Sequence, residues 1–159
     1  MSPSKNKITV DDLRGMALFS DLDEGKLKKI SAIARLEEAP AGTLLLREGD
    51  PADTVRVLVQ GRVSLTITVP GRKEATLATL SRGQLLGWSA LIPGSRWAAS
   101  ARALKACTMV AISGADLLNV CKGDFELGYH CMKNAMAAVA ERLAETRLLV
   151  LDMFGETNG

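Results

Sequence analysis

Apolar and polar residues alternate in three different ways along the chain, which predicts a helical start, a strand-rich middle and a helical end. Between residues 43 and 112, turn residues separate short apolar runs, and the run at residues 63–69 alternates with a period of two. Short strands at this spacing, without helices between them, are typical of a sandwich or jelly roll. We expect strands at residues 44–46, 55–59, 63–69, 75–80, 98–103 and 108–112. The pattern therefore predicts a mainly β fold, an antiparallel jelly roll with flanking helices.

Two helices are expected before the strands. Thr9 followed by Asp12 is a capping-box-like start with Asp in place of Glu. A second helix is expected from Asp21 or Asp23, because apolar residues then recur at helical spacing. Pro40, followed by Ala-Gly, is expected to end that helix.

The residues after Phe125 predict one long helix, at residues 125–154. Its apolar positions are spaced alternately by four and three residues, the pattern of a coiled-coil seam. We expect one face of this helix on the strands and the seam against a second copy of the chain, in a homodimer. The alternative is a helix that packs on its own strands only. The seam residues are Met132, Met136, Val139, Leu143, Thr146, Val150 and Met153.

Composition is that of one compact domain. The chain has 159 residues, 47% of them apolar and 24% charged. We expect a flexible tail at residues 1–8, a jelly-roll domain at 9–124, the long helix at 125–154 and a tail at 155–159. No apolar run is long enough to cross a membrane and the polar start is no signal peptide, so we expect a cytoplasmic protein without a membrane partner. A net charge of +2 and the lack of a recognition helix predict no direct DNA binding by this chain.

The cysteines and the histidine point to no catalytic or metal site. Cys107, Cys121 and Cys131 are an odd number at wide spacing, which fits neither a disulfide framework nor a zinc site. His130, beside Cys131, has too few possible co-ligands at useful spacing. We expect three reduced, mostly buried thiols, no metal, no cofactor and no enzyme activity, because a nucleophile–base set is not visible.

Residues 86–100, Leu-Gly-Trp-Ser-Ala-Leu-Ile-Pro-Gly-Ser-Arg-Trp-Ala-Ala-Ser, suit anion binding. Gly87 lets the backbone approach a ligand, and a short helix starting near Ser89 would present free N–H groups to a phosphate. Arg96 follows across a Pro-Gly turn and can fork onto phosphate oxygens. The run resembles the phosphate-binding cassette of cyclic nucleotide-binding domains, whose usual order is Gly-Glu-Leu-Ala-Leu, a short loop with Pro, then Arg. Trp88 stands where that family has the glutamate that holds the ribose 2′-hydroxyl.

Two glycines extend the resemblance into the first half of the domain. A Gly-Asp turn at Gly49 precedes an apolar strand, and Gly61 opens the next strand at the family's spacing. Arg56, between them, stands at a position that is usually apolar. We expect both glycines to be turn positions with positive φ that do not contact a ligand.

The resemblance implies a regulatory domain that binds cyclic AMP, cyclic GMP or a related anion and signals through a dimer helix, as in regulators of the catabolite activator type. It implies a ligand site made by the cassette and by a threonine on the long helix. The expected ligand-binding residues are Gly87, Trp88, Ser89, Ala90, Arg96, Ser100 and Thr146.

Several alternatives stay open at this point. If the cassette is shifted by one residue, Trp97 takes the place of the arginine, and Arg102 lies on the next strand. Trp88 either stacks on a ligand or fills the ribose space, and the Thr146 hydroxyl either reaches the ligand or bonds a carbonyl one turn earlier. The alternative function is a degenerate, ligand-free dimerisation module with its pocket filled by Trp88.

Overall fold

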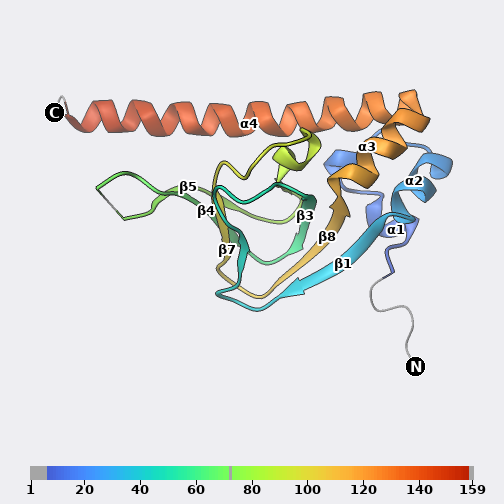
Figure 1. Ribbon diagram of the computed structural model, residues 1–159, viewed down its shortest axis with the longest axis horizontal. Coiled ribbons are helices and arrows are strands. Elements are labelled where there is room, and N and C mark those ends of the chain that lie inside the picture. The colour runs from blue at the N-terminus through green and yellow to red at the C-terminus, as the bar shows by residue number, and fades with distance from the viewer. Residues whose placement is uncertain (1–6, 72, 158–159) are drawn as a thin grey trace.

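The computed structural model describes residues 7–71 and 73–157, with side chains as far as residue 152, and its strands form two antiparallel four-stranded sheets (Figure 1). One sheet has the strand order β1-β8-β3-β6 and the other β2-β7-β4-β5. Apart from β4 with β5, all neighbouring pairs join strands that are not consecutive in the chain, as in a jelly roll, so the predicted fold class is confirmed. The strand bounds are β1 Ala34–Ala39, β2 Leu44–Leu46, β3 Thr54–Gln60, β4 Val63–Ile67, β5 Ala75–Leu80, β6 Leu85–Leu86, β7 Ser100–Ala103 and β8 Cys107–Ser113.

The prediction of a helix up to Pro40 is wrong, because that segment contains a strand. Helix α2 ends at Ser31, and β1 then pairs with β8 along its whole length, from Ala34 opposite Ile112 to Ala39 opposite Cys107. The roll therefore begins nine residues earlier than residue 43. Pairing with a distant strand outweighs the local helical pattern here, since β8 supplies partners for every residue of β1.

The helices before the roll begin as their capping residues predict. The Thr9 side chain and Asp12 form both bonds of a capping box at α1 (Val10–Leu13), and Asp23 caps α2 (Glu24–Ser31). A 3₁₀ helix, η1 (Ala17–Phe19), connects them. A flexible tail was expected at residues 1–8, but Lys7 and Ile8 belong to the folded part of the chain. Lys7 forms a β-bridge with Arg35 of β1, and Ile8 is buried.

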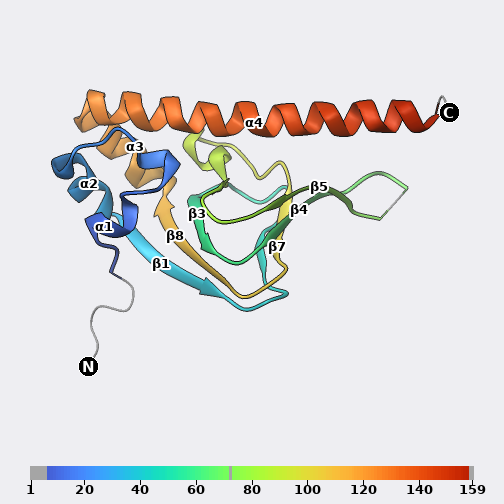
Figure 2. The same ribbon diagram turned by 180° about the vertical axis from the view of Figure 1, so that it is seen from behind.

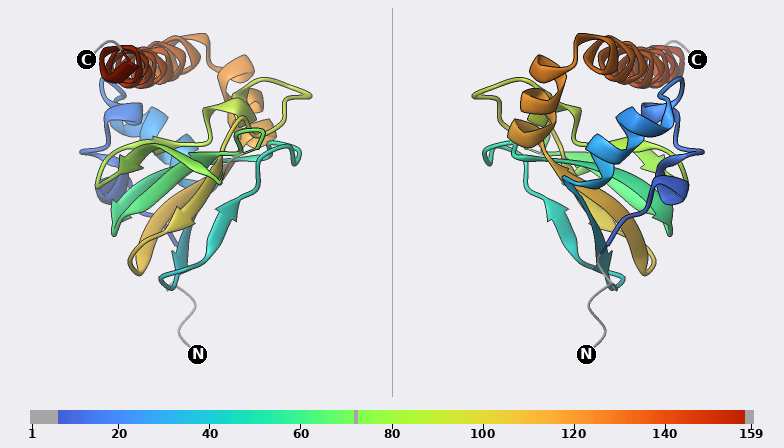
Figure 3. Two further views of the ribbon diagram at one scale, coloured as in Figure 1. Left: turned by 90° about the vertical axis from the view of Figure 1, so that its left-hand side faces the viewer. Right: turned by 90° about the vertical axis from the view of Figure 1, so that its right-hand side faces the viewer.

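Two helices follow the roll. The first, α3 (Gly114–Gly123), was not expected from the sequence, and its N-terminus is capped by Ser113. The second, α4 (Phe125–Thr157), starts where it was predicted to start and spans 33 residues, so the tail expected from residue 155 is helical as far as residue 157. Figures 1 and 2 show α4 lying along one side of the whole roll. Figure 3 shows α4 nearly end-on, with the strands of the roll below it.

Asp124 joins the N-terminal helices to the start of α4. Its carboxylate accepts a hydrogen bond from the Leu127 backbone N–H at 3.1 Å and another from the Lys29 ammonium at 2.9 Å. The bond from Lys29 is the larger cause, and the bond from Leu127 the second, of a pKa for Asp124 that lies below its ordinary value of 3.8. The charged carboxylate therefore stabilises the fold.

Replacing Asp124 with Asn is expected to lower the urea midpoint of unfolding at pH 7. Asparagine can still cap α4 but cannot pair with the Lys29 charge. Because the folded pKa is depressed, this stabilisation is fully present above the unfolded value of 3.8 and is lost as the pH falls through the folded pKa. Urea unfolding from pH 7 down to pH 3 should show the two proteins converging at low pH, and a constant gap would contradict the assignment.

Candidate functional site

The cassette, residues 86–100, leaves β6 through a left-handed glycine. Gly87 has φ of +89° and caps the 3₁₀ helix η2 (Trp88–Leu91). A Cβ atom at Gly87 would lie 2.8 Å from the Thr54 carbonyl oxygen and 3.0 Å from the Trp97 ring. Both the backbone conformation and the crowding therefore require glycine here. The expected short helix exists and begins one residue before Ser89.

Substituting Gly87 with Ala is expected to destabilise the protein by about 2 kcal/mol or more, because left-handed strain and overpacking act together. Gly94→Ala is the matched control, since Gly94 also has positive φ, +79°, but has no atom within 4 Å of its would-be Cβ. Urea unfolding should show the larger loss for Gly87→Ala. Equal losses would mean that crowding against Thr54 and Trp97 does not matter.

The cassette borders a cavity of about 50 Å³ whose lining is aliphatic and aromatic. Both tryptophans of the chain line it, and Ser89 is the one lining residue with a polar side chain. None of these lining residues is charged. The lining consists of Leu46, Leu65, Leu85, Leu86, Gly87, Trp88, Ser89, Trp97, Ala98 and Ala99.

Both candidate arginines lie outside this lining. The exposed Arg96 donates from Nη1 to the Gly49 carbonyl at 2.8 Å, and the exposed Arg102 donates from Nη1 to the Gly42 carbonyl at 2.8 Å. Each guanidinium thus bonds a loop carbonyl outside the cavity. Within a single chain, neither arginine faces the space where the sequence predicted an anion.

Trp97 occupies the pocket instead. Its side chain is 7% exposed, and its ring packs against Gly87 at the start of η2. This position is the one that Trp97 takes if the cassette is shifted by one residue. Trp88, half-buried, lines the same cavity. Two indole rings therefore border the space in which the sequence predicted an anion held by an arginine.

The other predicted ligand-binding residues are dispersed. Ala90 is buried outside the cavity lining, and its carbonyl contacts Gly114 at the start of α3. The Ser100 hydroxyl accepts a hydrogen bond from the Glu48 N–H at 2.9 Å, away from the cavity. The Thr146 hydroxyl donates to the Arg142 carbonyl at 2.9 Å, the back-bond that was one of its two expected roles. The structure therefore brings together only Gly87, Trp88 and Ser89.

The turn glycines have the predicted conformation. Gly49 has φ of +90° and Gly61 has φ of +109°, and neither lines the cassette cavity. The departure at Arg56 is compensated by an ion pair, since its Nε lies 2.9 Å from Glu37 Oε1 on β1. Residues 69–72, Val-Pro-Gly-Arg, are typical of a hairpin turn between β4 and β5, and Arg72 of this segment lies outside the described residues.

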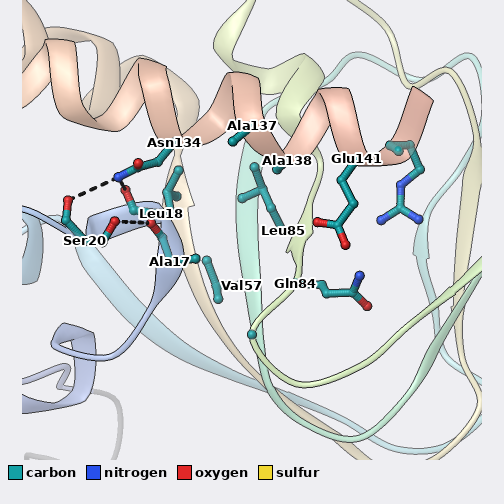
Figure 4. A pocket seen from close by; sticks show the side chains of 12 residues that line it. Ala17, Leu18, Ser20, Val57, Gln84, Leu85, Asn134, Ala137, Ala138 and Glu141 are labelled. Atoms are coloured by element: carbon teal, nitrogen blue, oxygen red, sulfur yellow. Dashed lines mark hydrogen bonds between the residues drawn. The ribbon is translucent and has the colours of Figure 1, made fainter. Parts of the chain in front are cut away.

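A larger cavity, of about 250 Å³, lies between η1, the roll and the roll-facing side of α4 (Figure 4). Asn134 on α4 closes one end by donating to the carbonyls of Leu18 and Ser20 at 3.1 and 3.2 Å. Glu141 and Arg142 line the other end, and Arg142 Nη1 lies 2.7 Å from Glu145 Oε2. This cavity was not expected from the sequence, because the residues that line it are distant from one another in the chain.

The opposite side of α4 carries an exposed apolar row, which we call the α4 stripe. Its members follow at spacings of four and then seven residues, so they share one helix face. Met136 is 72% exposed and Leu143 is 54% exposed. Other seam residues, Met132, Val139 and Thr146, are half-buried, and the side chain of Met153 lies outside the described residues. The α4 stripe consists of Phe125, Tyr129, Met136, Leu143 and Val150.

The described residues contain neither a metal-binding cluster nor a helix that could span a membrane. No group of three or more His, Cys, Asp or Glu side chains there is arranged to hold a metal ion. None of the helices described is both long and apolar enough to cross a bilayer. Cys107 and Cys131 are buried, Cys121 is half-buried, and the structure joins none of the three in a disulfide.

Comparisons with known proteins agree with the fold and the cassette. The family model for the cyclic nucleotide-binding domain matches residues 36–124. A crystal structure of a candidate cyclic nucleotide-binding protein of Geobacter metallireducens is 32% identical, with a TM-score of 0.76 over 86% of this chain and 98% of that chain. The catabolite activator protein of Thermus thermophilus is 27% identical, with a TM-score of 0.71 over 87% of this chain and 63% of that one.

Among curated relatives, the cGMP-dependent protein kinase isozyme 1 of Drosophila melanogaster is 38% identical over 86 residues. The match covers 53% of this chain and only 11% of the kinase. The similarity thus concerns one domain of a much longer protein. With the match of the family model over more than half of the chain, the antiparallel roll and the glycine-led cassette, the chain belongs to the cyclic nucleotide-binding domain family.

Proposed function

We propose that the chain is a non-catalytic regulatory module of this family that dimerises through α4 and whose cassette pocket is closed to cyclic nucleotides by Trp88 and Trp97. The observation that carries the proposal is the lining of that pocket. Two indole rings and aliphatic side chains surround a cavity of about 50 Å³. Ligand pockets usually measure about 300–1,000 Å³, so a nucleotide needs both rings to move.

Charge supports the same proposal. A cyclic phosphate has to exchange its water shell for donors in the pocket, and a charged donor contributes roughly 1.5–3 kcal/mol. The guanidinium of Arg96 is bound to the Gly49 carbonyl, and none of the residues that line the cavity is charged. Entry of the phosphate would therefore cost desolvation without a charged partner.

The cassette is connected to α4 through α3. Gly114, the first residue of α3, packs directly on the Ala90 carbonyl of η2. A movement of η2 toward α3 would therefore displace the start of α3. α3 in turn packs on α4. A change in the cassette thereby reaches the helix that carries the α4 stripe, which is the surface we propose for the dimer.

A second candidate function is weak binding of cyclic AMP, cyclic GMP or a related anion. Family membership favours it, as does the left-handed Gly87, which keeps η2 in position to present backbone N–H groups. In this version Arg96 leaves the Gly49 carbonyl and turns to the ligand, while Ser100 and the Thr146 of a partner copy add hydroxyl contacts.

Calorimetric titration of the unmutated chain with cyclic AMP and cyclic GMP separates the two candidates. The closed pocket predicts no saturable heat and no shift of the melting temperature at millimolar nucleotide. Saturable binding that disappears in Arg96→Ala and survives in Arg102→Ala would instead establish the second candidate. Both variants lose one bond to a loop carbonyl, so each controls for the other.

A further inference from the structure

Cys121 on α3 and Cys131 on α4 belong to two helices that pack on each other. A Cβ atom on Gly128 would lie 3.0 Å from both the Cβ and the carbonyl oxygen of Cys121, so the two backbones nearly touch. Cys131 follows Gly128 by three residues and therefore lies on the same face of α4, one turn further on. The two thiols are close enough to change each other's acidity.

We infer that Cys121 and Cys131 are an oxidisable pair that a hydroperoxide, or another two-electron oxidant of thiols, converts to a disulfide between α3 and α4. Cys107 is the third cysteine and has no such neighbour. It is buried, and its thiol donates to the backbone carbonyls of Lys105 and Arg62 at 3.2 and 3.4 Å. The inference needs no ligand. It concerns the chain with the α4 stripe uncovered, because Phe125 and Tyr129 of that stripe border the groove beside Cys121.

The two thiols differ in access and in acidity. Cys121 is half-buried and borders a shallow apolar groove with Phe125 and Tyr129, whereas Cys131 is fully buried. The Cys131 thiol beside it lowers the pKa of Cys121, whereas the Cys121 thiol first and burial second raise the pKa of Cys131. An accessible thiol of lowered pKa beside a second thiol is the arrangement of redox-sensing cysteines.

These differences give an order to the reaction. The Cys121 thiolate attacks one peroxide oxygen and breaks the O–O bond, and the released hydroxide takes a proton to form water. The Cys121 sulfenic acid is then attacked by the Cys131 sulfur, whose proton leaves with the displaced hydroxide as a second water. In total, two thiols and one hydrogen peroxide give one disulfide and two water molecules.

The disulfide would fix the angle between α3 and α4. These helices are consecutive, and only Asp124 separates them. Because the first residue of α3 contacts η2, oxidation would hold the cassette, α3 and the start of α4 as one unit. Amide hydrogen exchange in residues 122–130 should then be slower in the oxidised protein than in the reduced protein.

Hydrogen peroxide treatment of the purified chain, followed by alkylation under denaturing conditions and mass spectrometry, tests the inference. The number of alkylated cysteines should fall from three to one, with a mass loss of about 2 Da before alkylation. Trypsin should release residues 106–122 and 123–133 as one linked species that separates on reduction. Because residues 106–122 also contain Cys107, the same linkage must persist in Cys107→Ser.

Cys121→Ser should abolish the linkage, and because Cys121 is only half-buried, the fold should tolerate this change. If the variant does not fold, the count of free thiols in the unmutated chain still tests the inference. Three outcomes would overturn the inference. They are a linkage that disappears in Cys107→Ser, a Cys121 that accumulates sulfinic acid while Cys131 stays free, and three free thiols after a peroxide dose that oxidises free cysteine.

Discussion

Replacing Trp88 with Glu and Trp97 with Arg is expected to create cyclic nucleotide binding that the unmutated chain lacks. The double substitution supplies the glutamate and the arginine of the family's cassette pattern, with position 97 taking the arginine as in the register shifted by one residue. It also removes both indole rings from the pocket lining. Each restored charge-assisted hydrogen bond contributes about 1.5–3 kcal/mol, or roughly ten- to a hundredfold in affinity. Calorimetry against cyclic AMP and cyclic GMP measures the gain.

Trp88→Ala with Trp97→Ala is the matched control for this gain, because it also removes both indole rings from the pocket but adds no charge. We expect it to bind cyclic nucleotides at least about tenfold more weakly than the charged double variant. Melting curves must show that each variant is folded, since Trp97 is buried. Equal affinity of the double-alanine variant and the charged double variant would show that the two rings alone exclude the nucleotide. No binding by a folded charged double variant would contradict the proposed role of the tryptophans.

Placing glutamates on the α4 stripe is expected to convert the dimer that we propose into a monomer. Met136 and Leu143 are seven residues apart and exposed, so in a parallel pair of α4 helices each meets its own copy. Met136→Glu with Leu143→Glu would bring like charges together, which costs several kcal/mol and weakens dimerisation by about a hundredfold or more. Sedimentation velocity at micromolar concentration measures the change.

The control pair is Ala137→Glu with Ala144→Glu. Each control site follows a stripe residue directly, is exposed, and receives the same charge on the same helix, but it points away from the centre of the stripe. We expect this variant to sediment as the unmutated chain does. If the unmutated chain is itself a monomer at micromolar concentration, α4 is not the dimer surface that we propose.

Elements specified by local patterns were predictable from the sequence. Strand β5 was expected at residues 75–80 and is found at Ala75–Leu80, because apolar residues and flanking turn residues mark it. The capping residues located α1 and α2 for a similar reason, since a cap is a contact over three residues. The start of α4 was equally clear from its long helical period.

What the sequence did not show depends on contacts between distant residues. Strand β1 forms because β8, some seventy residues later, pairs with it. In the cassette, the order of residue types suggested Arg96 as the anion-binding group, but the backbone turns Arg96 toward Gly49 and Trp97 into the pocket. A shift of one residue exchanges a cation for an indole, and residue types alone do not decide between the two.

The two tryptophan side chains provide the most direct test of the closed pocket. Trp88 and Trp97 are the only tryptophans in the sequence, so the ¹⁵N–¹H spectrum of the protein contains two indole signals, and both rings line the cavity. We predict that neither signal moves when cyclic AMP or cyclic GMP is added to millimolar concentration. A saturable shift of either indole signal, absent with AMP as the control nucleotide, would show that the pocket opens to a cyclic nucleotide and would contradict the account.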